Sequence, residues 1–367
     1  MSGVTDIVDQ AAPTRSGKAT APRRTTVAVL PGDGIGPEVI EHTLSTLQVM
    51  DLGLDFDVLD QVNARRFLRT GEAITAEEID RVRASSALLM GAVGDPAVRT
   101  ADYARGVLLR LRAELDLYIN YRPARLLHDR LSPLRDPRRR AIDVIVVREN
   151  TEGLYSGVGG RLRPDTTHEV AMDADLTTAH GVRRVLDFAF ATARRQVCLV
   201  DKSNAVPFGG ALWQRLWREA RARYPHISAS HEYADAAAMK LVADPTSFEV
   251  IVTNNSYGDI LSDLTAQLAG GLGATASANL NHETNLCLYE PVHGSAPDIA
   301  GKGIANPIGA LLSAALMMDR LELADAARAL RRAIDGTVEH GICTPDLGGS
   351  HRTREVAEDV RARLLWG

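Results

Sequence analysis

Apolar and polar positions alternate along the chain in two different periods from Thr26 onward. Short apolar runs predict buried strands; they cover residues 27–30, 87–90, 142–147, 197–200 and 249–252. Longer stretches with a helical period predict helices; they cover residues 37–50, 107–117, 177–194, 209–223, 261–268, 306–318 and 324–338. Because strands and helices alternate, we expect an α/β protein with a largely parallel sheet.

Length and composition extend this picture to the organisation of the chain. With 367 residues, of which 45% are hydrophobic, the chain can bury a large core, and its length suggests two domains. Residues 1–24 mix small, polar and charged residues without hydrophobic periodicity. We therefore predict a disordered N-terminal extension before the first strand.

Charge and cysteine content argue against several classes of protein. A formal net charge of −5 and 5% aromatic residues give no sign of a nucleic-acid-binding surface. Cys198, Cys287 and Cys343 are widely spaced, which supports neither a disulfide framework nor a thiolate metal site. No apolar run approaches the roughly 20 residues that a membrane helix needs. We therefore predict a cytoplasmic protein that does not contact membranes.

Two carboxylates follow the apolar run at 249–252. Asp259 and Asp263 are four residues apart, so on a helix they share one face. At the carboxyl end of a strand, where open α/β sheets bind ligands, such a pair would suit Mg²⁺ or Mn²⁺. An acidic first turn that complements the helix dipole is the alternative, and the pair alone does not exclude it.

The glycine-rich segment 32–37 follows the first predicted strand and invites comparison with a dinucleotide-binding loop. Its third glycine, Gly36, comes too early for Rossmann spacing, and Pro37 lacks the N–H that a pyrophosphate would need. We therefore reject a Rossmann fold. A turn that lets a ligand approach the backbone and a plain strand-to-helix turn both remain open.

Three arginines are candidates for binding carboxylates. Arg148 directly follows an apolar strand, so its guanidinium lies at a strand end and needs a partner. Arg112 lies on a predicted helix, and Arg122 follows a predicted extended segment. A guanidinium matches a carboxylate with two hydrogen bonds, so three convergent arginines would suit a di- or tricarboxylate. Arg112 and Arg122, each taken alone, are more simply surface arginines.

Two further residues are candidates for proton transfer. Lys202 comes directly after the strand predicted around 197–200, where an ammonium near a second cation could have a depressed pKa and act as a base. Tyr155 is the second candidate, although an ordinary half-buried tyrosine is the simpler interpretation.

A series of motifs, in one order from about Val27 to the C-terminus, resembles the β-decarboxylating dehydrogenase family. This family contains 3-isopropylmalate, isocitrate, homoisocitrate and tartrate/D-malate dehydrogenases. The motifs are Gly-Asp-Gly-Ile-Gly-Pro-Glu at 32–38, Leu-Arg at 111–112 with Tyr-Arg-Pro at 121–123, Arg-Glu-Asn-Thr-Glu-Gly at 148–153, Asp-Lys-Ser-Asn at 201–204, Gly-Asp-Ile-Leu-Ser-Asp at 258–263, and Glu-Pro-Val-His-Gly-Ser-Ala-Pro-Asp-Ile-Ala-Gly-Lys-Gly at 290–303. The chain is most similar to the isopropylmalate dehydrogenases of actinobacteria.

The resemblance implies a two-domain fold of the isopropylmalate/isocitrate dehydrogenase type. Its central sheet is mixed but largely parallel and is flanked by helices. Residues 25–117 plus 270–367 would form the cofactor-binding domain, and residues 118–269 the substrate, metal and dimerisation domain. The resemblance further implies a homodimer with shared active sites.

The resemblance also assigns roles to the charged candidates. It implies that the malate carboxylates are held by Arg112, Arg122 and Arg148. Asp259 and Asp263, together with Asp235 of the partner subunit, would bind Mg²⁺ or Mn²⁺, and this Asp235 would also border the substrate.

The proton-transfer roles and the substrate pocket follow from the same resemblance. Lys202, contributed by the partner subunit, would help to deprotonate the C2 hydroxyl as hydride leaves to the nicotinamide, and Tyr155 would protonate the enol that follows decarboxylation. Leu108 and Leu109 would form an apolar wall against the C3 substituent, and Asn204 would border the substrate.

Cofactor choice can be inferred from the segment 293–306, which resembles the adenosine-binding loop of the family. Asp298 and Ile299 stand where NADP-dependent isocitrate enzymes carry Lys-Tyr. A carboxylate there can accept hydrogen bonds from a ribose diol but would repel a 2′-phosphate, so we expect NAD. The cofactor-binding residues implied are Ile35, His293, Gly294, Ser295, Ala296, Asp298, Ile299 and Asn306.

The expected activity is oxidative decarboxylation of 3-isopropylmalate to 2-oxoisocaproate in leucine biosynthesis. Arg105, Ala205 and the segment 254–257 depart from the usual isopropylmalate pattern. The same chemistry on another diacid therefore stays open: isocitrate, homoisocitrate, tartrate, D-malate, or a phosphonomethylmalate attracted by Arg105 and Arg110. A non-catalytic regulatory homologue is disfavoured because the family's catalytic and metal-binding residues are all present.

Overall fold

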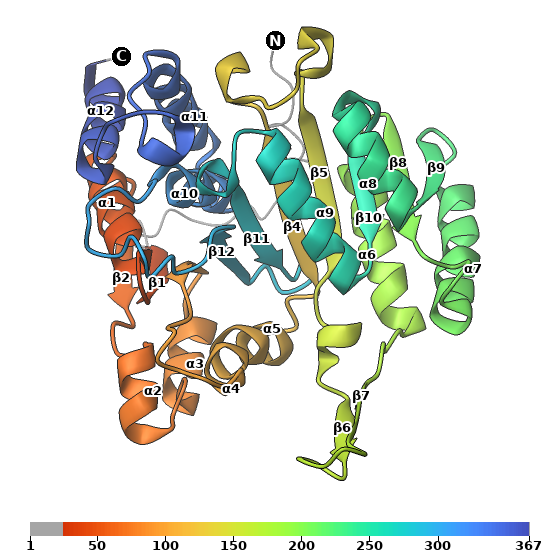
Figure 1. The fold of residues 1–367 in the computed structure, drawn as a ribbon. Helices are drawn as coiled ribbons and strands as arrows, with labels where there is room; N and C mark the ends of the chain where they lie inside the picture. Colours follow the sequence, from red (N-terminus) through yellow and green to blue (C-terminus); the bar gives the residue numbers. More distant parts are fainter. Residues whose placement is uncertain (1–24, 367) are drawn as a thin grey trace, which may run out of the picture.

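One large sheet covered by helices forms the body of the molecule in the computed structural model, which describes residues 25–366 (Figure 1). The extension predicted for residues 1–24 lies outside the described residues. From one edge to the other, the ten strands are β2 (Leu54–Val58), β1 (Thr25–Gly32), β3 (Ala87–Ala92), β12 (Cys287–Pro291), β11 (Ala276–Leu280), β4 (Ile119–Arg125), β5 (Asp143–Glu149), β10 (Val250–Thr253), β8 (Gln196–Asp201) and β9 (Ser228–Tyr233).

Most neighbouring strands run parallel, as the alternation of strands and helices predicts. The exceptions are the three antiparallel pairs β12–β11, β11–β4 and β4–β5 in the middle of the sheet. Three strands, β3, β10 and β12, are buried along their whole length. Continuous apolar runs, rather than alternating ones, are typical of such strands. The mixed, largely parallel sheet confirms the predicted fold class.

Helices cover both faces of the sheet (Figure 1). They are α1 (Gly36–Val49), α2 (Ala64–Thr70), α3 (Ala76–Ala84), α4 (Asp102–Ala104), α5 (Arg110–Glu114), α6 (Ala179–Thr192), α7 (Pro207–Arg223), α8 (Ala234–Ala243), α9 (Asn255–Leu268), α10 (Ile308–Arg320), α11 (Ala324–Glu339) and α12 (Thr353–Trp366).

Separate apolar cores lie at the two ends of the sheet. One joins β1, β3, β11 and β12 to α1 and α10–α12, so it combines both ends of the described chain. Another joins β4, β5, β8 and β10 to α6 and α7. The domain boundaries at 117/118 and 269/270 stay a prediction. The buried residues of the first core all come from residues 27–89 and 274–360, and those of the second all come from residues 118–252.

Beyond the main sheet, β6 (Gly159–Leu162) and β7 (Val170–Asp173) pair antiparallel as a small two-stranded arm. The arm extends away from the body of the molecule (Figure 1). All eight residues of the two strands are exposed.

Three local predictions differ from the structure. The helix expected at 261–268 begins earlier, at Asn255, because the Asn254 side chain caps it by accepting a hydrogen bond from the Tyr257 N–H. The segment 107–117 is a π-helix at 105–109 followed by the short α5, not one regular helix. Arg122 lies within β4 rather than after an extended segment.

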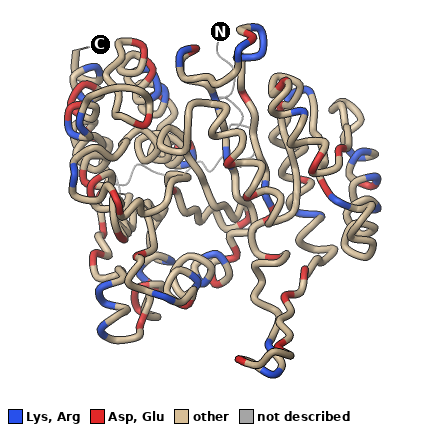
Figure 2. The backbone as a smooth tube through the Cα atoms, viewed as in Figure 1, with Lys and Arg blue, Asp and Glu red and all other residues tan. Residues whose placement is uncertain are grey.

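Charged residues of both signs are distributed over both halves of the molecule (Figure 2). Among residues 25–366, no helix combines the length and the apolar character that crossing a membrane requires.

Candidate active site

The close approach of α9 to β5 is the structural basis of the candidate site. β10 and β5 are parallel neighbours, with Thr253 paired to Arg148, so the carboxyl ends of both strands lie side by side. Helix α9 starts directly after β10, and its Gly258 packs on Arg148. A Cβ at Gly258 would lie 2.4 Å from the Arg148 Cγ, far inside van der Waals contact. Only glycine lets the helix lie this close to the strand.

The two carboxylates of α9 meet two of the predicted arginines. Arg148 donates from Nη1 to Asp259 Oδ1 at 2.6 Å, and Arg122 donates from Nη1 to Asp263 Oδ1 at 3.1 Å. The Arg122 Nη2 lies 3.6 Å from Asp259 Oδ1. Asp259 and Asp263 therefore share one face of α9, which meets Arg122 in the middle of β4 and Arg148 near the end of β5.

Arg148 needs these partners because its side chain is only 2% exposed. Its Nε and Nη2 both donate to the Asn255 Oδ1, at 3.0 and 2.7 Å. Burial first, and then the neighbouring charges of Arg122 and Arg112, lowers the pKa of Arg148. Three guanidinium groups close enough to repel one another favour an anionic ligand between them.

Arg112, on α5, is the third arginine of the group. It is buried, and its Nη2 lies 3.4 Å from Glu290 Oε1 on β12. Its Nε has no hydrogen-bond partner within residues 25–366. Burial lowers the pKa of Arg112 as well. Glu290 is a contributor that the sequence analysis did not single out.

Tyr155 lies over the carboxylate face of α9. It belongs to a 3₁₀ turn at Leu154–Ser156 with Gly153 before it and Gly157 after it, both at positive φ. The Tyr155 hydroxyl donates to Asp259 Oδ2 at 3.2 Å, and the Arg148 guanidinium lies 5.6 Å from the centre of the ring. Burial and the charge of Asp259 raise the pKa of Tyr155, so the phenol keeps its proton at neutral pH. Such a group can donate a proton.

Lys202 and Asp235 form a second group of predicted residues. Lys202 follows β8, Asp235 lies in the first turn of α8, and the two form an ion pair of 2.7 Å. Among the described residues, no hydrogen bond or ion pair joins this pair to Asp259, Asp263 or Tyr155. Within one chain, the candidate site therefore consists of two groups that no hydrogen bond or ion pair of the described residues links, and Lys202 lines a small hollow together with Asn254 and Tyr257 at the start of α9.

The glycine turn at the end of β1 contacts the predicted adenosine-binding loop. The Ile35 N–H donates to the Ser295 carbonyl at 2.8 Å, and a Cβ at Gly34 would lie 1.9 Å from that oxygen. The group that packs closely against Gly34 is thus the Ser295 carbonyl of the protein's own loop at 293–306. Ile35 also packs with Ala296 and Ile299 in a small apolar cluster.

Asp33 fixes this turn, although the sequence analysis did not single it out. Its carboxylate accepts hydrogen bonds from the Ala64 N–H at 2.7 Å, the Gly94 N–H at 3.0 Å and the Tyr103 hydroxyl at 2.6 Å. Tyr103 is 70 residues away in the chain. No local pattern could reveal such a partner.

The other predicted cofactor residues differ in their exposure and in whether their polar atoms already have hydrogen-bond partners. The His293 Nε2 is buried without a hydrogen-bond partner among the described residues, and burial lowers the pKa of the ring. A neutral imidazole with an unused nitrogen fits a hydrogen bond to a bound nucleotide. Asn306 is already engaged, since its Nδ2 donates to Asp346 and its Oδ1 accepts from the Ile308 N–H. Gly294 and Asp298 are exposed.

The predicted substrate wall lies on the π-helix at 105–109. Leu108 packs against an apolar core cluster, whereas Leu109 is partly exposed and belongs to none of the core clusters of the described residues. Arg110 is engaged by Glu114 at 2.6 Å and by the Ile74 carbonyl at 2.7 Å. Arg105 lies against Gly157, close to the Tyr155 turn. Asn204 and Ala205 are exposed after β8.

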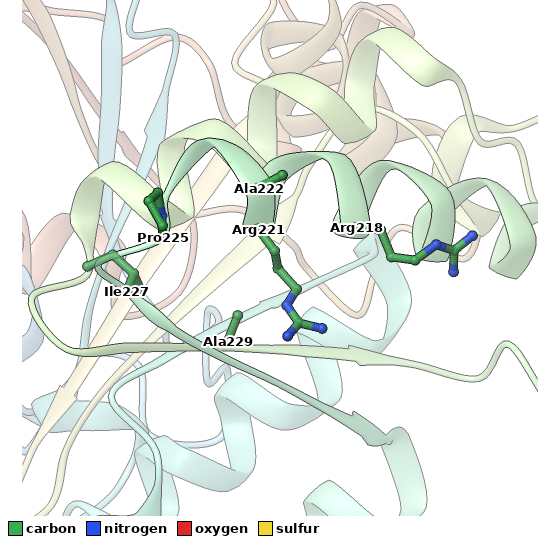
Figure 3. Close-up of a pocket in the computed structure, with 6 residues that line it drawn as sticks. All are labelled: Arg218, Arg221, Ala222, Pro225, Ile227 and Ala229. Atoms are coloured by element: carbon green, nitrogen blue, oxygen red, sulfur yellow. The ribbon is translucent and has the colours of Figure 1, made fainter.

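A hollow of about 390 Å³ lies elsewhere, between α7 and the strand β9 (Figure 3). Its titratable lining residues are Arg218 and Arg221, and none of the predicted site residues lines it. It lacks the paired acids and bases that catalysis of the expected kind requires.

The isocitrate/isopropylmalate dehydrogenase family pattern matches residues 26–360. The 3-isopropylmalate dehydrogenase of Mycobacterium marinum is 46% identical over 315 residues, which cover 84% of this chain and 93% of that protein. The chain belongs to this family. A second relative, the 3-isopropylmalate dehydrogenase of Thermobifida fusca, is 42% identical over 93% of this chain and 98% of its own length.

Solved structures of family members agree with this assignment. The isocitrate dehydrogenase of Methylococcus capsulatus superposes with a TM-score of 0.85 at 34% identity, covering 93% of this chain and 99% of that one. A β-decarboxylating dehydrogenase of Thermococcus kodakarensis superposes with a TM-score of 0.76 at 36% identity, covering 93% and 96%. The fold implied by the sequence motifs is thereby confirmed.

Proposed function

We propose that this family member catalyses the NAD-dependent oxidative decarboxylation of a 3-substituted malate, with 3-isopropylmalate as the leading substrate. The observation that carries the proposal is the convergence of Arg122, Arg148, Tyr155, Asp259 and Asp263 at one edge of the sheet. Cations for the carboxylates, hard oxygen ligands and a proton donor are the groups that this reaction needs. The relatives named 3-isopropylmalate dehydrogenase support the choice of substrate and a role in leucine biosynthesis.

The donor set fits a divalent metal of the Mg²⁺ or Mn²⁺ type. Asp259 and Asp263 offer carboxylate oxygens from one helix face, and such cations prefer a few carboxylates together with water and substrate oxygens. Residues 25–366 hold no group of three or more metal-ligand side chains. Asp235 of the partner subunit is the ligand that we propose to complete the site. When bound, the metal would polarise the C2 oxygen of the substrate and stabilise negative charge there during loss of CO₂.

The chain's own residues then supply binding and proton transfer. Arg112, Arg122 and Arg148 hold the two malate carboxylates and fix the C1–C2–C3 plane. Lys202 of the partner subunit, as a neutral amine released from its ion pair with Asp235, accepts the C2 hydroxyl proton while hydride leaves C2 for the cofactor. After the C3 carboxylate departs as CO₂, the Tyr155 hydroxyl donates its proton to C3 of the enol, which gives the 2-oxo acid.

NAD is the dinucleotide that we propose. Its support is Asp298, whose exposed carboxylate would accept hydrogen bonds from a ribose diol and repel a 2′-phosphate. The unused His293 Nε2 offers a further polar contact beside it in the loop.

A homodimer with shared sites would bring the two groups of site residues together. Exposed apolar side chains lie on α8 and α9, where Met239 is 68%, Val242 53% and Ile260 66% exposed. The arm β6–β7 exposes Leu162 and Met172 in the same way. We propose that these side chains belong to the subunit contact, since contiguous exposed apolar surface marks protein–protein interfaces.

Subunit mixing tests the shared site. In the proposed shared site, one subunit supplies Tyr155 and its partner supplies Lys202. Lys202→Ala and Tyr155→Phe therefore each disable both sites of a homodimer. Co-assembly of the two inactive variants should restore about one quarter of wild-type activity, because half of the dimers are mixed and each mixed dimer holds one intact site. No recovery on mixing, with mixed dimers shown by mass spectrometry, would mean that each subunit contains its own complete site.

A malate with an acidic C3 substituent is the second candidate, and Arg105 favours it. The side chain of this exposed arginine forms no hydrogen bond or ion pair with the described residues, and it lies against the Tyr155 turn. The test compares kcat/KM for 3-isopropylmalate, isocitrate, homoisocitrate, D-malate, tartrate and a phosphonomethylmalate. Preference for isopropylmalate supports the leading substrate, preference for an acidic substituent supports Arg105 as its partner, and no NADH formation with any acid refutes both.

A further inference from the structure

The environment of Lys202 contains an aromatic group as well as an acid. Its Nζ lies 2.7 Å from Asp235 Oδ1 and 5.7 Å from the centre of the Tyr233 ring. Lysine has four rotatable side-chain bonds, so a single ion pair leaves the ammonium free to swing about its partner. A ring face close to the ammonium adds a second restraint.

His231 holds the Tyr233 ring in place. The two rings meet edge to face, with centroids 5.1 Å apart and planes at 88°. This arrangement is favourable because the positive edge of one ring meets the negative face of the other. Residues 231 and 233 are two apart on β9, so their side chains stand on the same face of the sheet.

Asp201 in turn holds His231. The His231 Nε2 donates to Asp201 Oδ1 at 2.9 Å. In the parallel pair β8–β9, Asp201 lies opposite Tyr233 and Leu199 opposite His231, so the hydrogen bond is a diagonal one across the pair. Asp201 is 6% exposed and also accepts from the Ser203 N–H at 3.0 Å and from Gln214 Nε2 at 2.7 Å. Its carboxylate is therefore rigidly placed.

These contacts link Asp201, His231, Tyr233 and Lys202 in a closed ring of interactions, because Asp201 is the residue before Lys202. We call this set of four residues the positioning circuit. Asp201 fixes His231, His231 fixes the Tyr233 ring, and the ring faces the ammonium of Lys202. Glu232, between the two aromatic residues, points to the other face of the strand and pairs with Lys240. It does not compete with the ring or with Asp235 for Lys202.

We propose that His231 and Tyr233 are positioning residues that aim the Lys202 amine at the substrate hydroxyl. The proposal rests on the proposed role of Lys202 as the proton acceptor from C2. Tyr233 acts through the face of its ring and not through its hydroxyl, and His231 acts through its hydrogen bond to Asp201. Neither residue touches the substrate.

Substitutions at Tyr233 separate the ring from the hydroxyl. Tyr233→Phe keeps the ring and should retain kcat within about twofold, whereas Tyr233→Leu should lower kcat by about 10- to 100-fold, the loss expected when a reacting group is displaced by about 1 Å. KM for the malate and for NAD should stay unchanged in both variants, because the arginines and the adenosine loop are not altered. Equal kcat in the Phe and Leu variants would overturn the proposal.

Substitutions at His231 test the link to Asp201. His231→Ala should lower kcat like Tyr233→Leu, and His231→Gln, whose amide can still donate to Asp201, should recover part of the loss. The double variant His231→Ala/Tyr233→Leu should be no slower than the worse single variant, because both act through one path. Multiplicative losses would show that the two residues act separately, which contradicts the circuit.

His226→Ala is the matched control. This exposed histidine also lies beside a tyrosine, Tyr224, at 6.4 Å, but it is remote from Lys202. It should leave kcat and KM unchanged; a loss equal to that of His231→Ala would mean that any change near β9 slows the enzyme.

A crystal structure of His231→Ala separates this proposal from the proposed function. Displacement of the Tyr233 ring from Lys202 supports the positioning circuit even if the wild-type enzyme oxidises none of the tested acids, a result that would refute the proposed function alone. An unmoved ring and ammonium would overturn the circuit whatever the activity.

Discussion

The contact between Gly258 and Arg148 gives a sharp test of how the site is built. Replacing Gly258 by alanine adds one methyl group in the first turn of α9. That Cβ would lie 2.4 Å from Cγ, 2.6 Å from Cβ and 3.0 Å from Cδ of Arg148. Ordinary contacts between carbon atoms are about 3.5–4.0 Å, so α9 and Arg148 must separate by about 1 Å.

Two opposing terms decide the stability of the Gly258→Ala variant. Alanine favours a helix over glycine by about 1 kcal/mol. Overpacking a buried contact costs about 1–3 kcal/mol. We therefore expect a net loss of about 1 kcal/mol in the free energy of unfolding. We also expect an activity loss of about 100-fold, because Asp259 and the Arg148 guanidinium no longer hold their relative positions.

Gly336→Ala, in the last turn of α11, is the control. Its Cβ would meet only the far end of the flexible Arg363 side chain, 3.0 Å from Nη1. This variant should gain about 0.5–1 kcal/mol and keep full activity. Thermal unfolding and initial rates of NADH formation on both variants give the comparison. If Gly258→Ala gains stability as Gly336→Ala does and keeps wild-type kcat/KM, the close approach does not determine the site geometry.

Three further predictions concern the proton donor, the cofactor and the scaffold. Tyr155→Phe removes the hydroxyl that contacts Asp259, so kcat should fall by about 10²–10⁴-fold in steady-state assays while Tm is unchanged; wild-type turnover would end its role as proton donor. Asp298→Lys with Ile299→Tyr should shift the ratio of kcat/KM for NADP to that for NAD upward by more than about tenfold, and an unchanged ratio would refute the role of Asp298. Glu78→Ala removes a buried ion pair with Arg66, whose side chain is 10% exposed, and should lower the free energy of unfolding by about 3–5 kcal/mol without affecting kcat; a loss below about 1 kcal/mol would contradict this.

Local patterns predicted the part of the site that lies close together in sequence. An apolar run places Arg148 at the end of β5, and helical spacing places Asp259 and Asp263 on one face of α9. Asn255 could have been found by the same reasoning, since it comes just after β10, beside the last residues of β5 where Arg148 lies. Each of these inferences depends on one strand end or one helical turn.

Contacts between distant segments were not accessible in this way. Arg112 meets Glu290 across 178 residues, and Asp33 meets Tyr103 across 70. Both depend on the order of strands in the sheet, which hydrophobic periodicity does not determine. The π-helix at 105–109 was missed because its apolar positions fit a regular helical period as well.

The most direct test of the account is the stoichiometry of the reaction. Purified protein with NAD, Mn²⁺ and 3-isopropylmalate should release one CO₂ for each NADH formed. The rate should vanish on chelation of the metal and return on its addition. NADH formation without CO₂, or no turnover with this or any other C3-substituted malate, would contradict the assignment of Arg122, Arg148, Tyr155, Asp259 and Asp263 to oxidative decarboxylation.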